Sequence, residues 1–145
     1  MLSQDFKEFI QSLNANNVRY LVVGGYAVAV HGHPRHTKVI DIWIAMDEEN
    51  AERMVLALND FGVGSLGLQP DDFLVPDQII QLGYPPARID LLTTLAGVDF
   101  EACYTARVEI VLDGVPVSFI DIESLKKNKR AAGRLQDLAD LKNLA

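Results

Sequence analysis

The stretch that decides the fold is RYLVVGGYAVAVHGHPRHTKVIDIWIA, residues 19–45. It begins with a β-branched and aromatic run, Tyr20 to Val23, that stops at two glycines, a pattern typical of a strand that ends in a turn. The Ala- and Val-rich segment from Tyr26 to His31 predicts a short buried helix. The segment from Val39 to Ala45 is apolar except at one position and predicts a second strand.

The exception is Asp41, a carboxylate inside a strand that otherwise looks buried. A buried acid costs free energy unless it is paired or binds a cation. Side chains alternate along a strand, so Val39, Asp41 and Trp43 share one face. Free backbone N–H groups at the start of a helix attract anions, so the turn at Gly24 and Gly25 is a candidate phosphate site that faces Asp41.

A second lone acid, Asp90, lies in another apolar segment. Gln78 to Leu82 and Ala87 to Thr93 predict two strands joined by the turn Gly-Tyr-Pro-Pro. We interpret Asp90 as a site residue, because two embedded acids on two strands accompany a glycine turn. The alternative is that Asp90 pairs with Arg88, its neighbour on the same face.

The remaining segments predict helices and one more hairpin. Amphipathic patterns predict a helix from Ser3 to Asn16 and another that opens at Asp47, and Asp113-Gly114 between two apolar runs predicts a hairpin. Residues 121–145 predict a helical tail, broken at Gly133. Its basic half is predicted to contact an anionic ligand or to form a solvated helix face; the residues concerned are Lys127, Lys129, Arg130 and Arg134.

Composition limits the possible classes of protein. The chain has 145 residues, enough for one domain with a sizeable core, and its formal net charge of −7 argues against general affinity for nucleic acid. The single cysteine, Cys103, excludes an internal disulfide and favours a reducing compartment. No apolar run approaches membrane-spanning length, so we expect a cytoplasmic protein with no membrane partner.

Three histidines, His31, His33 and His36, lie close together in the sequence. A zinc site needs three or four ligands in a defined geometry. Gly32 and Pro34 separate the histidines, which indicates a loop rather than a structural zinc site.

These residues resemble the nucleotidyltransferase superfamily, which has a polymerase-β-like fold, and within it the small bacterial group of minimal nucleotidyltransferases and AbiEii-type toxins. The family has a Gly-Gly turn, a helix, a loop, a strand with two acids spaced by one residue, and a third acid on a later strand. Gly24 and Gly25 match the turn, Asp41 matches the second acid and Asp90 the third, whereas the position of the first acid is Val39. The loop pattern HG-x-PR-x-T is matched by His31, Gly32, Pro34, Arg35 and Thr37.

The resemblance implies an α/β (α+β) fold with a mixed, twisted central sheet flanked by helices, as a single domain over residues 1–145. It implies transfer of a nucleoside monophosphate from a nucleoside triphosphate to an acceptor hydroxyl, with Mg²⁺ or Mn²⁺ bound by Asp41 and Asp90. Val39 cannot ligate a metal ion, so we expect the ions to be weakly bound. The residues expected to bind the nucleotide and its phosphates are Gly24, Gly25, Arg35, Lys38, Lys129 and Arg130.

Three functional hypotheses follow from the sequence. The first is a nucleotidyltransferase of reduced or unusual activity, or a variant in which residue 39 was altered, with an RNA end or a protein hydroxyl as the candidate acceptor. The second is a non-catalytic relative that binds a nucleotide or serves as one half of a toxin–antitoxin pair. The third is a structural or interaction domain.

Overall fold

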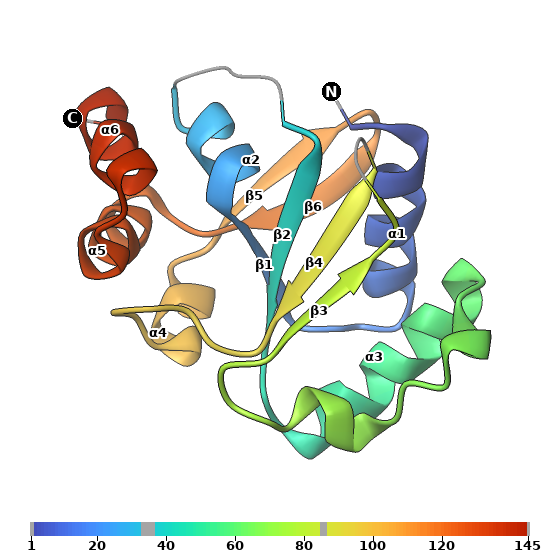
Figure 1. Cartoon of the computed structure of the whole chain (residues 1–145). Helices are drawn as coiled ribbons and strands as arrows, with labels where there is room; N and C mark the ends of the chain where they lie inside the picture. Colours follow the sequence, from blue (N-terminus) through green and yellow to red (C-terminus); the bar gives the residue numbers. More distant parts are fainter. Residues whose placement is uncertain (1, 33–36, 85–86, 145) are drawn as a thin grey trace.

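The computed structural model describes residues 2–32, 37–84 and 87–144, which form a mixed six-stranded sheet flanked by helices (Figure 1). The helices are α1 (Gln4–Ala15), α2 (Gly24–Val30), α3 (Glu48–Phe61), α4 (Phe100–Thr105), α5 (Ile122–Ala132) and α6 (Leu135–Leu144). The strands are β1 (Tyr20–Val23), β2 (Val39–Ile44), β3 (Ile79–Leu82), β4 (Arg88–Leu92), β5 (Val108–Leu112) and β6 (Val115–Phe119). Two short 3₁₀ helices, Gly64–Leu66 and Pro70–Phe73, follow α3.

The strands follow the order β3-β4-β2-β1-β6-β5 across the sheet. The pairs β2–β4 and β1–β6 are parallel, and the other neighbouring pairs are antiparallel. Both predicted hairpins are therefore present, one at each edge of the sheet. The expected α/β fold with a mixed central sheet is confirmed.

The core lies on both faces of the central strands. Ile40, Ile42 and Ile44 on one face of β2 are no more than 1% exposed, as their alternation predicts. On the same side of the molecule α1 packs against α3 through an edge-to-face contact of Phe9 and Phe61. On the other face of β2, Trp43 is buried against Phe100 of α4, with ring centroids 5.0 Å apart.

Figure 1 shows α5 and α6 side by side near the C-terminus, beyond α2 and away from α1 and α3. The face of β2 that carries Asp41 and Trp43 is thus covered at one end by α4, and the helices near its other end are α2, α5 and α6.

The helix boundaries agree with local sequence signals. Ser3 caps α1 and Asp47 caps α3 through side-chain hydrogen bonds to backbone N–H groups. The predicted break at Gly133 separates α5 from α6, and this residue is left-handed with φ 66°. None of the helices in the described ranges is long and apolar enough to cross a membrane.

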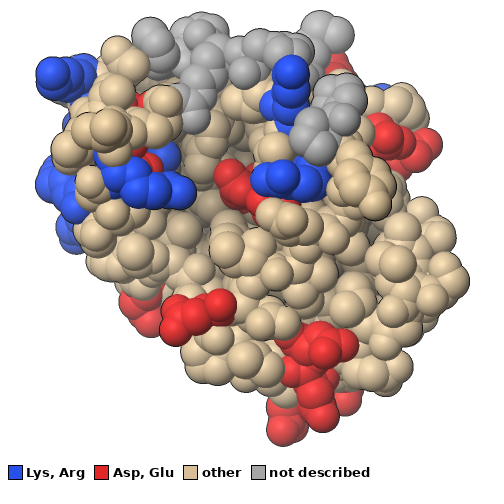
Figure 2. Space-filling model, in the orientation of Figure 1, with Lys and Arg blue, Asp and Glu red and all other residues tan. Residues whose placement is uncertain are grey.

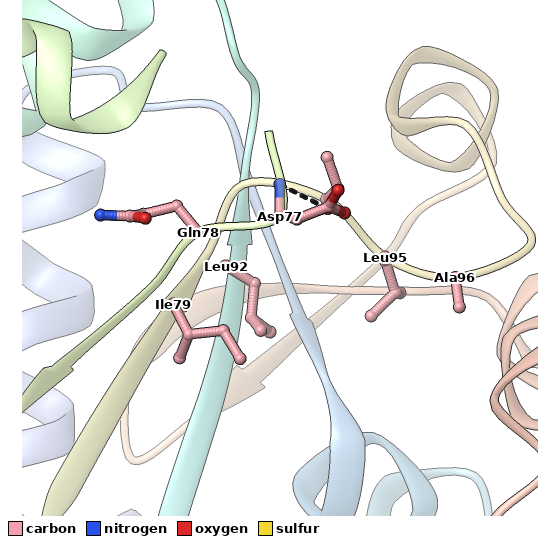
Figure 3. Close-up of a pocket in the computed structure, with 7 residues that line it drawn as sticks. Asp77, Gln78, Ile79, Leu92, Leu95 and Ala96 are labelled. Atoms are coloured by element: carbon pink, nitrogen blue, oxygen red, sulfur yellow. Dashed lines mark hydrogen bonds between the residues drawn. The ribbon is translucent and has the colours of Figure 1, made fainter. Parts of the chain in front are cut away.

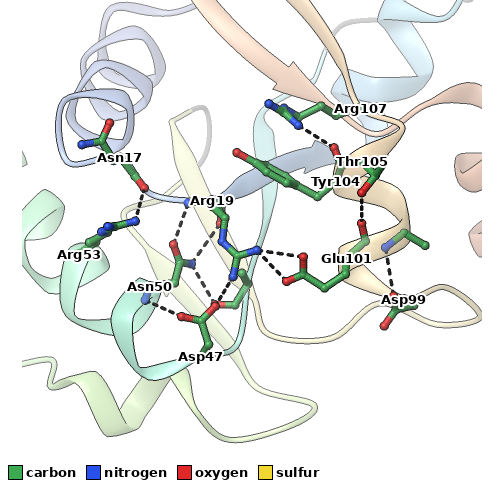
Figure 4. Close-up of polar contacts among 12 residues, drawn as sticks. Asn17, Arg19, Asp47, Asn50, Arg53, Asp99, Glu101, Tyr104, Thr105 and Arg107 are labelled. Carbon is green, nitrogen blue, oxygen red and sulfur yellow. Dashed lines mark hydrogen bonds and ion pairs between the residues drawn. The ribbon is translucent and has the colours of Figure 1, made fainter.

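A polar network at the end of the sheet that carries Arg19 fixes the layers to one another (Figure 4). The buried Asn50 of α3 accepts a hydrogen bond from the Arg19 N–H at 2.7 Å and donates to the carbonyls of Arg19 and Ala45. The Arg19 guanidinium joins Asp47 at the start of α3 to Glu101 of α4. This network therefore ties β1, α3 and α4 together at the end of β1 opposite Gly24.

Candidate functional site

The two embedded acids are neighbours in the sheet. Asp41 of β2 is the register partner of Asp90 of β4, and these strands are parallel, so both side chains leave the same face. Asp90 is only 7% exposed and Asp41 is half-buried. The structure therefore brings the two predicted site carboxylates together on adjacent strands.

Their proximity changes the acidity of Asp41. Burial raises the pKa of Asp41 to about 6, and the negative charge of Asp90 adds to the rise. The positive charges of Lys129, Arg88 and Arg134 act in the opposite direction. Because Lys129 and Arg134 come from the α5–α6 region, this region lies close enough to influence the carboxylates.

The turn between β1 and α2 comes close to Asp41. Gly24 has φ +67°, and a Cβ atom placed on it would lie 2.2 Å from Oδ2 of Asp41. A residue other than glycine would therefore be strained in its backbone and would collide with the carboxylate. Helix α2 starts at Gly24 itself, not after both glycines as the sequence suggested, because this left-handed residue turns the chain directly from the strand into the helix.

Asp90 is engaged by Arg88, the alternative that the sequence left open. Nε of Arg88 donates to Oδ1 of Asp90 at 2.9 Å, and an Nη2 hydrogen is donated to Oδ2 at 3.2 Å. Such two-point contacts between guanidinium and carboxylate are strong and directional. The pairing does not remove Asp90 from the site, because its register partner is still Asp41.

Lys129 does not point freely into solvent. It is 5% exposed, and Nζ lies 3.1 Å from Oδ1 of Asp137 and 3.1 Å from Oδ2 of Asp140. Burial would raise the pKa of Asp137, but hydrogen bonds from Arg134 and Lys129 outweigh burial and lower this pKa. The alternative of a solvated Lys129 is therefore wrong, because the residue lies in a buried ion-pair cluster that holds α6 against α5, whereas its contact with a phosphate stays a prediction.

The sequence analysis did not identify Asp137 and Asp140 as partners of Lys129. The signal was their spacing of three residues, which places both carboxylates on one side of a helix. Figure 2 shows basic side chains gathered over the region of α5 and α6, and acidic and basic side chains meeting in a hollow near the middle of the same face.

The other expected phosphate-binding residues are less constrained. Lys38 and Arg130 are exposed, and Lys38 contributes its carbonyl to the Arg88 N–H at 3.3 Å. Arg35 lies outside the described residues, as do His33 and His36. Nε2 of His31 lies 2.7 Å from the carbonyl oxygen of Ile120, which links the end of α2 to the segment before α5.

The residues present fit one divalent ion better than two. Across the described ranges, no three His, Cys, Asp or Glu side chains gather as a metal site. Asp41 and Asp90 offer oxygen ligands that suit Mg²⁺ together with substrate phosphates. However, both Asp90 oxygens already accept hydrogen bonds from Arg88, and Val39 has no atom that could bind a metal ion. A full two-ion carboxylate clamp does not fit this arrangement.

A separate pocket lies at the far end of β4 (Figure 3). It has a volume of about 290 Å³ and is lined by Asp77, Gln78, Ile79, Leu92, Thr94, Leu95 and Ala96. Two of its polar residues are paired with each other, since Oγ1 of Thr94 accepts from the Asp77 N–H and donates to the Asp77 carboxylate. This pocket is mainly apolar and has no group aimed at a charged ligand.

Solved structures share this fold. A "putative nucleotidyltransferase" from Thermotoga maritima is similar with a TM-score of 0.61 and 15% identity, over 94% of this chain and 88% of that one. An antigenic nucleotidyltransferase-like protein from Paracoccidioides brasiliensis has a TM-score of 0.55 and 18% identity, over 99% of this chain and 75% of that one. The chain therefore has a nucleotidyltransferase-like fold. No protein-family model and no curated protein sequence matches it.

Proposed function

We propose that the face of the sheet with Asp41 and Asp90 forms a cleft that binds a nucleoside triphosphate, and that the protein slowly transfers nucleoside monophosphate to an acceptor hydroxyl with release of pyrophosphate and of the hydroxyl proton. The observation that carries the proposal is the register pairing of these two carboxylates beside the Gly24 turn. The nucleotidyltransferase-like fold supports it. The finer assignment to the bacterial minimal-nucleotidyltransferase and AbiEii-like group rests on the sequence pattern alone.

The chain's own residues divide the work of binding. Gly24 and Gly25 let a phosphate approach the backbone, and Lys38, Arg35 and Arg130 supply positive charge to the triphosphate or the acceptor. Asp41, with Asp90 beside it, would hold one Mg²⁺ or Mn²⁺ that arrives with the nucleotide. Such an ion neutralises phosphate charge and orients the triphosphate.

The proton of the acceptor hydroxyl needs a base within hydrogen-bond reach. Asp41 is the candidate for this role, because both oxygens of Asp90 already accept hydrogen bonds from Arg88. Val39 offers no ligand beside it, so transfer is expected to be slow. If Val39 prevents transfer altogether, the cleft serves nucleotide binding only, as in a non-catalytic toxin–antitoxin partner.

The test is a thermal-shift screen of ATP, GTP, CTP and UTP, each with EDTA, Mg²⁺ or Mn²⁺. A ligand that binds only the folded state raises the melting temperature. We expect one triphosphate to raise it in the parent, and we expect the additional rise caused by metal to vanish in Asp41→Asn. Asp5→Asn, an exposed acid in the first turn of α1, is the matched control and should behave as the parent does.

Transfer is measured separately, with labelled nucleotide and RNA or protein acceptors. Labelled product that depends on Mg²⁺ or Mn²⁺ supports the enzyme, and nucleotide binding without product supports the binding protein. A flat thermal response to all four triphosphates under every metal condition would refute both.

A further inference from the structure

The residue opposite Val39 is Arg88. In the parallel pairing of β2 and β4, Val39 is the register partner of Arg88, and Asp41 is the partner of Asp90. The four side chains thus lie on one face as two neighbouring pairs. The position where the resemblance places the first acid is apolar, and the position beside it carries a guanidinium.

Arg88 is tightly held but keeps unused donors. A guanidinium has five N–H groups and is always charged. Arg88 uses two of them on Asp90, and its side chain is 30% exposed while that of Asp90 is 10% exposed. Val39 offers no second acceptor to Arg88, so the remaining N–H groups are available to a ligand on the open side.

The cations near the paired carboxylates differ in what they contact. Among the described residues, Lys129, Arg88 and Arg134 each lower the pKa of Asp41 by their charge. Lys129 and Arg134 form ion pairs with acids of α6. Of these three cations, Arg88 is the one that pairs with a carboxylate on the sheet.

We propose that Arg88 is a resident cation of this site: it holds Asp90 in the place of a divalent ion and donates its remaining N–H groups to the polyphosphate. The contact between Arg88 and the polyphosphate rests on the proposed nucleotide binding. The role of Arg88 in place of an ion at Asp90 does not depend on nucleotide binding. Binding of polyphosphate then persists without metal, and removal of Arg88 frees Asp90 to join Asp41 as a metal ligand.

The first measurement is the melting temperature against Mn²⁺ concentration without nucleotide. The parent should respond little, and Arg88→Gln should be stabilised by Mn²⁺, because two unpaired neighbouring carboxylates then face the ion. Arg107→Gln is the matched control, since Arg107 also pairs with an acid two residues on, Glu109, and its side chain is 31% exposed. It should respond as the parent does.

The second measurement is calorimetric titration of inorganic triphosphate in EDTA. The parent should bind, and Arg88→Gln should lose at least about tenfold in affinity, the factor expected from loss of one charge-assisted hydrogen bond. Arg88→Lys keeps the charge but cannot contact both Asp90 oxygens in the same way, so it should be intermediate in both measurements. It also serves if Arg88→Gln does not fold.

The outcomes are distinguishable. Parent-like behaviour of the Arg88 variants in both measurements would overturn the resident cation. Binding of triphosphate by the parent only with Mn²⁺, and not in EDTA, would overturn the phosphate contact but leave the proposed function standing. Absence of binding under both conditions would overturn the proposed function, while the Mn²⁺ response of Arg88→Gln would still decide whether Arg88 replaces an ion at Asp90.

Discussion

Replacement of Asp41 by asparagine should stabilise the metal-free protein above pH 6. The pKa of Asp41 is raised from 3.8 to about 6, so the folded state binds more protons than the unfolded state between these pH values. The contribution of Asp41 to the unfolding free energy is therefore fully present below pH 3.8 and is lost as pH rises through about 6. Asparagine resembles the neutral acid and does not suffer this loss.

The magnitude follows from the size of the shift. A difference of about two pKa units corresponds to about 3 kcal/mol of unfolding free energy. In a domain of this size that is roughly 6–12 °C in melting temperature. The difference between Asp41→Asn and the parent should be near zero at pH 4 and should reach about this value above pH 7.

The assay is urea unfolding in EDTA at a series of pH values from acid to mildly alkaline. At each pH, the unfolding free energy of the parent is subtracted from that of Asp41→Asn, which cancels the effect of the other acids. Asp5→Asn controls for the loss of one negative charge. A difference that stays constant with pH would show that the pKa of Asp41 is not raised by burial and by Asp90.

Four further substitutions test the surroundings of the cleft. Gly24→Ala should destabilise the fold by about 1–2 kcal/mol from its left-handed backbone alone, and should displace the Asp41 carboxylate, seen as a changed pH profile of stability. Asn50→Ala should lower the unfolding free energy measured in urea by about 2–4 kcal/mol, because it leaves buried backbone groups without their hydrogen-bond partner. Lys129→Met should cost free energy at the lower end of about 3–5 kcal/mol, because it removes the buried cation shared by Asp137 and Asp140 while Arg134 still pairs with Asp137. Val39→Asp should increase stabilisation by Mn²⁺ and raise transfer activity; an unchanged Mn²⁺ response would show that position 39 does not face the site.

The sequence was sufficient to predict the sheet and its flanking helices. A nearly continuous apolar run identified β2, the Asp113-Gly114 pair identified the hairpin of β5 and β6, and Gly133 marked the break in the helical tail. These features depend on neighbours along the chain, which is why pattern and propensity determine them.

The charged partners could be predicted only in part. The Arg88–Asp90 pair was foreseeable, because residues two apart in a strand share a face. The position of Arg88 beside Val39 was not, because the register of two parallel strands separated by a long connection is fixed by tertiary packing. Lys129 looked solvated for a similar reason, since its acidic partners lie on the following helix and only the packing of α5 against α6 buries them.

The most direct test of nucleotide binding at this cleft is a calorimetric titration in Mg²⁺. The triphosphate that gives the largest thermal shift is titrated into the parent and, separately, into Gly25→Val. Gly25 lies in the first turn of α2, two residues after the end of β1. A branched side chain there would block the approach of phosphate to the backbone. We predict binding by the parent and none by a variant whose circular dichroism and cooperative unfolding match the parent's. Equal affinity in the two proteins would place the triphosphate elsewhere and contradict the assignment of the cleft.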